Sequence, residues 1–239
     1  GPRPAGSLHV PDQDQHQLRL SATPDRSDLL DEQHLIPDTD VSLGPYRLRF
    51  ARTLEDLAMV RRLRYAVFNV ELGKGLAGSH ETGVDADAFD RQCQHLMVLE
   101  RDTGAAVGTY RMQTAAAAHA GHGWYTSGEF ELGEMPTDVL DEAAELGRAC
   151  GAGAHRDKTV LFLLWHGLIK YAQHTGIKAF FGCSSLTGTD PKPAVALYAQ
   201  LLREHKVHAE LKAPPRLAMA CPLVSWPDRD EAERVEVPK

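Results

Sequence analysis

Apolar and polar residues follow two periods along the chain, and each period predicts one type of element. Alternation with a period of two, together with turn signals, predicts strands. These cover 46–51, 95–100, 105–114, 145–150, 178–184 and 216–223, and a further extended segment is expected at 124–132. Apolar residues spaced three and four apart predict helices over 53–70, 136–142, 159–175 and 193–205. Helices that lie between strands of one sheet indicate an α/β (α+β) fold.

The first 44 residues differ in composition from the rest of the chain. They contain no aromatic residue, and they carry eight acidic residues against three arginines. Such a segment buries too little apolar surface to offset its ordering entropy. We therefore expect a largely flexible, acidic N-terminal arm over 1–44, one folded domain over 45–227 and a charged C-terminal tail over 228–239.

Composition and charge exclude several classes of protein. Apolar residues make up 43% of the chain and charged residues 25%, as in ordinary globular proteins. The 26 basic residues are outnumbered by 33 acidic ones, which argues against nucleic acid as the main partner. The longest apolar run, 160–169, is too short to span a bilayer, and no leader of the secretory type opens the sequence. Four widely spaced cysteines suit a reducing compartment, so we expect a cytoplasmic protein with no metal site.

Several polar residues stand where a catalytic site would need them. Arg64 and Phe68 share one stripe of the first helix, where they could frame a carboxylate and an acyl chain. On the same helix, Arg61 is expected on a solvated face. Asp87 and Asp90 close the following loop, and two acids at this spacing can converge on a cation such as a substrate ammonium.

The central strands add three candidates. Arg111 lies within a strand and needs a partner if it is buried. Glu145 and Arg148 are three apart, which by simple alternation places them on opposite faces. Glu145 could act as a general base, directly or through a water, or it could form a structural ion pair with Arg111.

A segment of small residues links Arg148 to the apolar helix that begins near Thr159. It ends in Arg156 and Lys158 at the start of that helix. Backbone amides and the helix dipole favour an anion there, and two cations would neutralise it. This segment is therefore the candidate phosphate-binding loop.

Taken in order, these motifs resemble those of acyl-homoserine lactone synthases and, more closely, of the related ornithine lipid synthases, which are N-acyltransferases often labelled hemolysin-like. The resemblance covers about residues 46–200. It rests on Arg64-x-x-x-Phe68, Asp87-x-x-Asp90, Gly108-Thr109-Tyr110-Arg111, the segment 124–130 (WYTSGEF), the segment 145–150 (ELGRAC), the segment 163–167 (LLWHG) and the segment 181–185 (FGCSS).

The resemblance implies a GNAT-like acyltransferase fold, with a central mixed, mostly antiparallel sheet flanked by helices. It implies transfer of a long, or 3-hydroxylated, fatty acyl group from acyl carrier protein or acyl-CoA to the α-amine of an amino acid such as ornithine, as in aminolipid biosynthesis. No permanently bound cofactor is needed. Such an enzyme could lie against the inner membrane without spanning it, because its product is lipid-like.

The resemblance also assigns roles to residues. Glu145 would deprotonate the acceptor ammonium, and Tyr198 would protonate the leaving thiolate. The remaining roles concern the two substrates. Asp87 and Asp90 would hold the acceptor, and Arg64, Arg111 and Arg148 would fix those acids or the acceptor carboxylate. Residues 156–159 (Arg156, Lys158 and Thr159 among them) would bind the pantetheine phosphate.

The simplest mechanism is direct attack of the neutral amine on the thioester, with the oxyanion stabilised by backbone amides near Cys150. Acyl carrier protein is acidic, so we expect it to dock on a local basic surface. The candidates are Arg61, Arg62 and Lys74, or Arg156 and Lys158.

Two departures from the family pattern leave alternatives open. The tryptophan that lactone synthases carry after the helical phenylalanine is absent, which argues against lactone formation. Arg148-x-x-Gly151-x-Gly153 matches the usual GNAT phosphate loop but lies upstream of the helix. The alternatives are an N-acetyltransferase that uses acetyl-CoA on a small amine, and a non-catalytic binding protein. A long-chain enzyme would need an apolar acyl slot, for which the candidate lining is Phe68, Leu96, Phe162 and Trp165.

Overall fold

The structure is a computed structural model of the 239-residue chain, and it describes residues 23–24, 33–186, 188 and 190–220. The predicted tail at 228–239 and most of the predicted N-terminal arm lie outside these ranges. None of the helices in the described ranges is long and apolar enough to cross a membrane.

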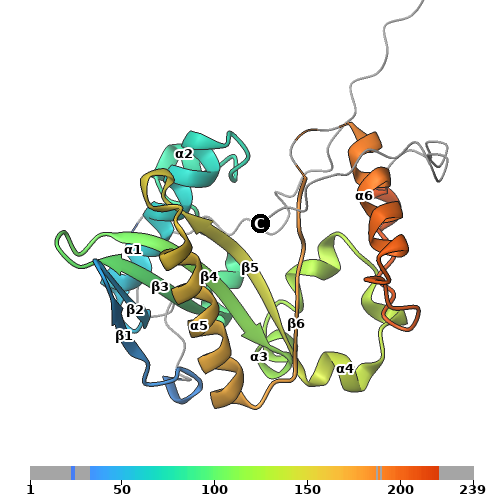
Figure 1. The fold of residues 1–239 in the computed structure, drawn as a ribbon, viewed down its shortest axis with the longest axis horizontal. Coiled ribbons are helices and arrows are strands. Elements are labelled where there is room, and N and C mark those ends of the chain that lie inside the picture. Colours follow the sequence, from blue (N-terminus) through green and yellow to red (C-terminus); the bar gives the residue numbers. More distant parts are fainter. Residues whose placement is uncertain (1–22, 25–32, 187, 189, 221–239) are drawn as a thin grey trace, which may run out of the picture.

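A six-stranded sheet forms the centre of the fold (Figure 1). Its strands lie side by side in chain order: β1 (Asp40–Leu43), β2 (Tyr46–Phe50), β3 (Gln94–Glu100), β4 (Ala106–Thr114), β5 (Ala143–Gly151) and β6 (Ala179–Phe181). Every neighbouring pair is antiparallel except β5 and β6, which are parallel. The prediction of a mixed, mostly antiparallel sheet is therefore confirmed.

The sheet begins earlier than the composition suggested. β1 lies within the segment predicted as an arm, and it pairs with β2 over Asp40↔Arg49 to Leu43↔Tyr46. Ile36 also belongs to the main hydrophobic core. Residues upstream of 45 therefore contribute an edge strand to the sheet and one apolar side chain to its core.

Helices cover both faces of the sheet. The helices are α1 (Leu54–Arg64), which continues as the π-helical η4 (Tyr65–Glu71), α2 (Ser79–Thr82), α3 (Ala115–Ala120), α4 (Thr137–Asp141), α5 (Lys158–Thr175) and α6 (Pro191–Arg203). Thr53 caps α1 in a reciprocal capping box with Asp56. α1 packs Leu57 and Val60 against Met97 on one face of the sheet.

The other face carries α5, which crosses in front of the sheet in Figure 1. Leu163 and Leu168 of α5 belong to one core cluster with Leu96 and Val98 of β3. At Gly167 the helix approaches so closely that an added Cβ would lie 2.5 Å from the side chain of Leu96. The two helices therefore fix which face each strand residue occupies.

Two predicted extended segments are not strands. Residues 124–132 instead form 3₁₀ turns at Tyr125–Gly128 and Leu132–Glu134, with one isolated bridge between Phe130 and Pro215. The amides of Tyr125 and Thr126 donate to a side chain rather than to a neighbouring strand, which explains the turn. Of the predicted strand 216–223, the described part forms a 3₁₀ turn over Leu217–Met219, and residues 221–223 lie outside the described ranges.

Candidate functional site

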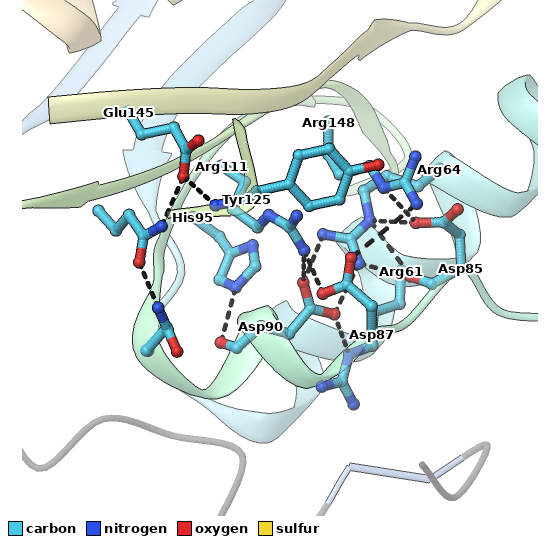
Figure 2. A network of polar contacts seen from close by, with 12 residues as sticks. Arg61, Arg64, Asp85, Asp87, Asp90, His95, Arg111, Tyr125, Glu145 and Arg148 are labelled. Carbon is cyan, nitrogen blue, oxygen red and sulfur yellow. Dashed lines mark hydrogen bonds and ion pairs between the residues drawn. The ribbon is translucent and has the colours of Figure 1, made fainter. Parts of the chain in front are cut away.

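Seven charged side chains form a buried network between α1 and the middle of the sheet (Figure 2). Four are arginines and three are aspartates, and the side chains are between 0 and 15% exposed. They come from α1 (Arg61 and Arg64), from the segment before β3 (Asp85, Asp87 and Asp90), from β4 (Arg111) and from β5 (Arg148). The fold thus brings together all the charged residues that were expected from the sequence to bind the acceptor.

Asp90 is the centre of this network. Its carboxylate accepts hydrogen bonds from Arg61 Nε at 3.1 Å, from Arg64 Nη2 at 2.6 Å and from Arg111 Nη1 at 2.8 Å. Burial alone raises the pKa of a carboxyl group, but Arg64 and Arg111 outweigh it and hold the pKa of Asp90 well below its ordinary value. Asp90 therefore stays ionised and serves to hold three guanidinium groups in place.

Arg61 corrects the expectation of a solvated face. Its side chain is 0% exposed and pairs with Asp90. The residue therefore cannot belong to a surface that docks acyl carrier protein. Two exposed residues of the expected docking surface, Arg62 and Lys74, lie on the outside of α1 and just beyond η4.

A β-bulge in β5 corrects the expectation for Glu145 and Arg148. β4 pairs Arg111 with Gly147 and Thr109 with Cys150, so one residue of β4 faces two of β5. Arg148 has φ +47° within this bulge. Alternation would have turned its side chain toward α5, but the bulge turns it to the same face as Glu145.

Arg148 is held loosely compared with the other arginines. Its Nε lies 3.3 Å from Asp85 Oδ1, its Nη2 lies 3.9 Å from Asp87 Oδ2, and its guanidinium lies 5.4 Å from the centre of the Phe68 ring. It forms no hydrogen bond with any residue that the structure describes, and its Nε is buried. Asp87 is engaged at only one carboxylate oxygen: its Oδ1 accepts from Arg111, while its buried Oδ2 accepts no hydrogen bond from the described residues.

Glu145 is engaged at both carboxylate oxygens. Oε2 accepts from Gln113 Nε2 at 2.5 Å and from the Tyr125 amide at 2.9 Å, and Oε1 accepts from the Thr126 amide at 2.6 Å. The side chain thereby ties the 3₁₀ turn after Trp124 to β4 and β5. The structural ion pair with Arg111 that the sequence left open is not formed.

Three residues of this site, Asp85, Tyr125 and His95, carried no role at the sequence level. Asp85 pairs with Arg64 at 3.0 Å and with Arg148 at 3.3 Å. The Tyr125 ring lies 5.7 Å from the Arg111 guanidinium and edge-on to Phe89 at 5.4 Å. His95 lies beneath Arg111 and Asp90, with Nε2 3.4 Å from the Asp90 carbonyl oxygen. Burial lowers the pKa of His95 to about 3, so the ring is neutral. Tyr125 belongs to the WYTSGEF segment of the resemblance, but neither its spacing nor its type indicated a place in the site.

The structure argues against the predicted phosphate loop at residues 156–159. Arg156 pairs with Glu71, with Nη2 2.8 Å from Oε2. Asp157 caps α5 and accepts from the amides of Thr159 at 2.8 Å and Val160 at 2.9 Å. These amides are therefore occupied, and a carboxylate stands where the phosphate was expected. Lys158 is exposed beside them.

Other predicted residues lie apart from the network. Tyr198 is 46% exposed on α6, beyond β6 in Figure 1. Cys150 is half-buried at the end of the bulge, and burial raises the pKa of its thiol to about 12. Phe162 and Trp165 are 59% and 49% exposed on α5, whereas Leu96 is in the core. These residues do not form a shared acyl slot with Phe68, which lies on the other face of the sheet against Arg148.

β5 and β6 separate after a short parallel contact. Their pairing covers Ala143↔Ala179, Ala144↔Phe180 and Glu145↔Phe181. Beyond this pairing the segment after β6 diverges from β5, as Figure 1 shows, while β5 continues along β4 to Gly151. On the β6 side, the β5 edge from Gly147 to Gly151 therefore pairs with no strand of the described region.

Comparison with known proteins identifies the relatives of this chain. Residues 63–166 match the family model described as an acetyltransferase (GNAT) domain. An L-ornithine N(alpha)-acyltransferase of Rhodobacter capsulatus is 32% identical over 187 residues, which cover 75% of this chain and 71% of the relative. Proteins of the same name from Rhizobium meliloti (35% over 167 residues, 65% of this chain and 56% of the relative) and Agrobacterium fabrum (32% over 157 residues, 63% and 54%) also match. The chain spans about half the length of these last two relatives.

Proposed function

The chain belongs to the L-ornithine N(alpha)-acyltransferase family and has the GNAT fold, and on this premise we propose that it transfers a fatty acyl group from a thioester donor to the α-amine of an amino acid, with ornithine as the acceptor. The α-ammonium loses a proton and attacks the thioester carbonyl carbon. The C–N bond forms, the C–S bond breaks, and the thiolate takes up a proton. One proton is released for each amide formed.

The observation that carries the proposal is the pair formed by Arg148 and Asp87. The two side chains approach to 3.9 Å between Nη2 and Oδ2, and each presents a buried polar atom that has no hydrogen bond among the described residues. Buried polar atoms without partners are rare in folded proteins. A zwitterion would satisfy both, with its α-carboxylate on Arg148 and its α-ammonium on Asp87.

The hydrogen bonds made by Glu145 and Asp87 bear on which carboxylate takes the proton. Glu145 can take the ammonium proton only by giving up one of its three hydrogen bonds or by acting through a water. Asp87 Oδ2 has no such competitor. We therefore favour Asp87 for direct contact with the ammonium, and Glu145 for holding the turn that carries Tyr125.

The donor is expected along the edge of β5 beyond its short pairing with β6. An extended pantetheine arm carries amide groups that can pair with the β5 edge from Gly147 to Gly151. The glycine-rich segment 151–153 follows this edge, and it replaces residues 156–159 as our candidate for the phosphate. The donor thiol is carried either by acyl carrier protein or by CoA. Arg62, Lys74 and Lys158 are exposed cations that could meet an acidic carrier protein.

The test supplies the full 239-residue chain with L-ornithine and three donors: 3-hydroxypalmitoyl carrier protein, palmitoyl-CoA and acetyl-CoA. Mass spectrometry identifies the product, and a thiol reagent follows the release of the donor. We expect Nα-acyl ornithine from one or both long-chain donors. If only acetyl-CoA is consumed, the alternative N-acetyltransferase is correct; if no donor is consumed by a folded chain, the acyltransferase proposal is wrong.

Arg148→Gln tests the acceptor site, with Arg62→Gln on the exposed face of α1 as its control. Loss of a charged hydrogen-bond partner costs about 1.5–3 kcal/mol, so the KM for ornithine should rise about 10- to 150-fold. The control variant should keep the KM for ornithine. Equal values in the two variants would show that Arg148 does not bind the acceptor.

The outer face of α5 is our candidate for contact with a membrane surface. Leu161, Phe162, Trp165 and Ile169 are each between 44 and 59% exposed there. An enzyme whose product is lipid-like gains from releasing it at a bilayer, and an apolar helix face that includes tryptophan suits the interfacial region. Phe162→Ser should reduce flotation with anionic phospholipid vesicles; unchanged flotation, or none for the wild type, would refute this assignment.

A further inference from the structure

Tyr125 occupies a central position in the network, although the mechanism above does not use it. Its ring is half-buried, packs edge-on against Phe89 at 5.4 Å and lies 5.7 Å from the Arg111 guanidinium. Figure 2 shows the ring crossing the site between Arg111 and Arg148, with the hydroxyl directed toward Arg148. The hydroxyl forms no hydrogen bond with the residues that the structure describes.

The position of this ring is fixed through its backbone. The amides of Tyr125 and Thr126 both donate to the Glu145 carboxylate. Just upstream, Gln92 and Gln113 donate to the carbonyl oxygen of Gly123, at 3.0 and 3.3 Å. The turn is thus tied to β4 and β5 on both sides of the ring, and a phenol held in this way is organised before any ligand binds.

The chemistry of the hydroxyl suits an anionic ligand. Burial raises the pKa of Tyr125, so the group keeps its proton and can donate a hydrogen bond. The neighbouring buried atoms without hydrogen bonds include one donor, Arg148 Nε, and several acceptors, Asp87 Oδ2 and both carboxylate oxygens of Asp85. Arg148 Nε lies 3.3 Å from Asp85 Oδ1 in an ion pair. A carboxylate lying on the Arg148 guanidinium still has lone pairs free for a second donor from the side of the ring.

We propose that the Tyr125 hydroxyl donates a hydrogen bond to the α-carboxylate of an acceptor bound at Arg148, and that it thereby makes the site select amino acids over amines that lack this carboxylate. The inference rests on the proposed function, because it requires an amino-acid acceptor. It adds a specificity-determining contact from a turn whose purpose would otherwise be structural.

Tyr125→Phe tests the contact, because it removes the hydroxyl and keeps the ring packing. Tyr110→Phe is the matched control, since Tyr110 packs against the core on the α5 face of the sheet. The acceptor pair is L-ornithine and 1,4-diaminobutane, which has the amines but no carboxylate. We expect Tyr125→Phe to lower kcat/KM for L-ornithine about tenfold or more, through KM, the loss typical of one hydrogen bond to a charged group. The value for 1,4-diaminobutane and the KM for the acyl donor should not change.

Calorimetric titration of L-ornithine into each protein gives a second measurement that does not depend on turnover. The Kd should rise by the same factor in Tyr125→Phe and stay constant in Tyr110→Phe. An unchanged Kd and an unchanged preference would overturn the inference. So would a fall in kcat that is equal for both acceptors with KM constant, because the hydroxyl would then act at the thioester. A wild-type chain that acylates an amine but no amino acid would overturn the proposed function itself.

Discussion

His95 makes the stability of the fold depend on pH over a defined range. The side chain lies on the α1 face of β3 and is 5% exposed. Burial is the main reason why its pKa falls to about 3; Arg64 and Arg111 lower it further, while Asp90 opposes them. In the unfolded chain the pKa returns to about 6.5. The folded protein therefore keeps this imidazole neutral at pH values where the unfolded chain protonates it.

The sign and the size of the effect follow from this difference. Between about pH 6.5 and pH 3 the unfolded chain binds a proton that the folded chain does not, so stability is lost as the pH falls through this window. From pH 7 to pH 4 the loss due to His95 is about 3 kcal/mol. Asp90 contributes to stability in a different pH range. Its pKa is depressed in the folded chain, so its stabilisation is complete above about pH 3.8, the ordinary pKa of an aspartate, and is lost as the pH falls below that value.

Urea denaturation of the wild type and of His95→Gln, at several values from pH 7 to pH 4, measures this loss. Glutamine can still donate to the Asp90 carbonyl oxygen but does not titrate. The variant should lose about 3 kcal/mol less than the wild type over this range. His119→Gln, an exposed histidine on α3, serves as the control and should follow the wild type. Parallel curves for His95→Gln and the wild type would refute the reasoning.

Three further substitutions test the packing of the site and of the core. Asp90→Asn leaves three buried guanidinium groups without their shared carboxylate and should destabilise the fold by about 3–5 kcal/mol in urea denaturation; a loss below 1 kcal/mol would contradict its central place. Glu145→Gln replaces one acceptor oxygen by a donor, and should cost about 1–3 kcal/mol and speed hydrogen exchange of the two amides it binds. Gly167→Ala should cost about 1–3 kcal/mol because its Cβ meets Leu96, whereas Gly133→Ala, which points into open space, should be neutral.

The pattern of apolar residues predicts most of the sheet and both covering helices. β2 to β5, α1 and α5 form within a few residues of the predicted bounds, because each buries an apolar stripe of the expected period. Besides the unpredicted strand β1, the prediction is wrong at 124–132 and in the described part of 216–223, residues 216–220. In 124–132 the backbone bonds to a side chain or forms one isolated bridge. Local alternation carries no information about such long-range partners.

The site was predicted in its members but not in its geometry. Arginine is a residue type usually found at the surface, so the sequence placed Arg61 there. Its burial is compensated by an ion pair with Asp90, which comes from a loop distant in the sequence. The left-handed backbone of Arg148 reverses the alternation of β5, and no residue type marks that bulge. Asp157 and Glu71 occupy the groups expected to bind phosphate, and the sequence contained both without indicating that they would compete.

The shared use of Asp90 by three arginines has an evolutionary consequence. Replacing one member alone by a neutral residue leaves a buried charge without its partner. The members of the network can therefore be exchanged only together. Among homologous sequences, replacement of Asp90 by a neutral residue should coincide with loss of charge at Arg64 or Arg111. Co-occurrence of these positions would therefore sort homologues into those that keep the acceptor site and those in which a related fold has taken up a different substrate.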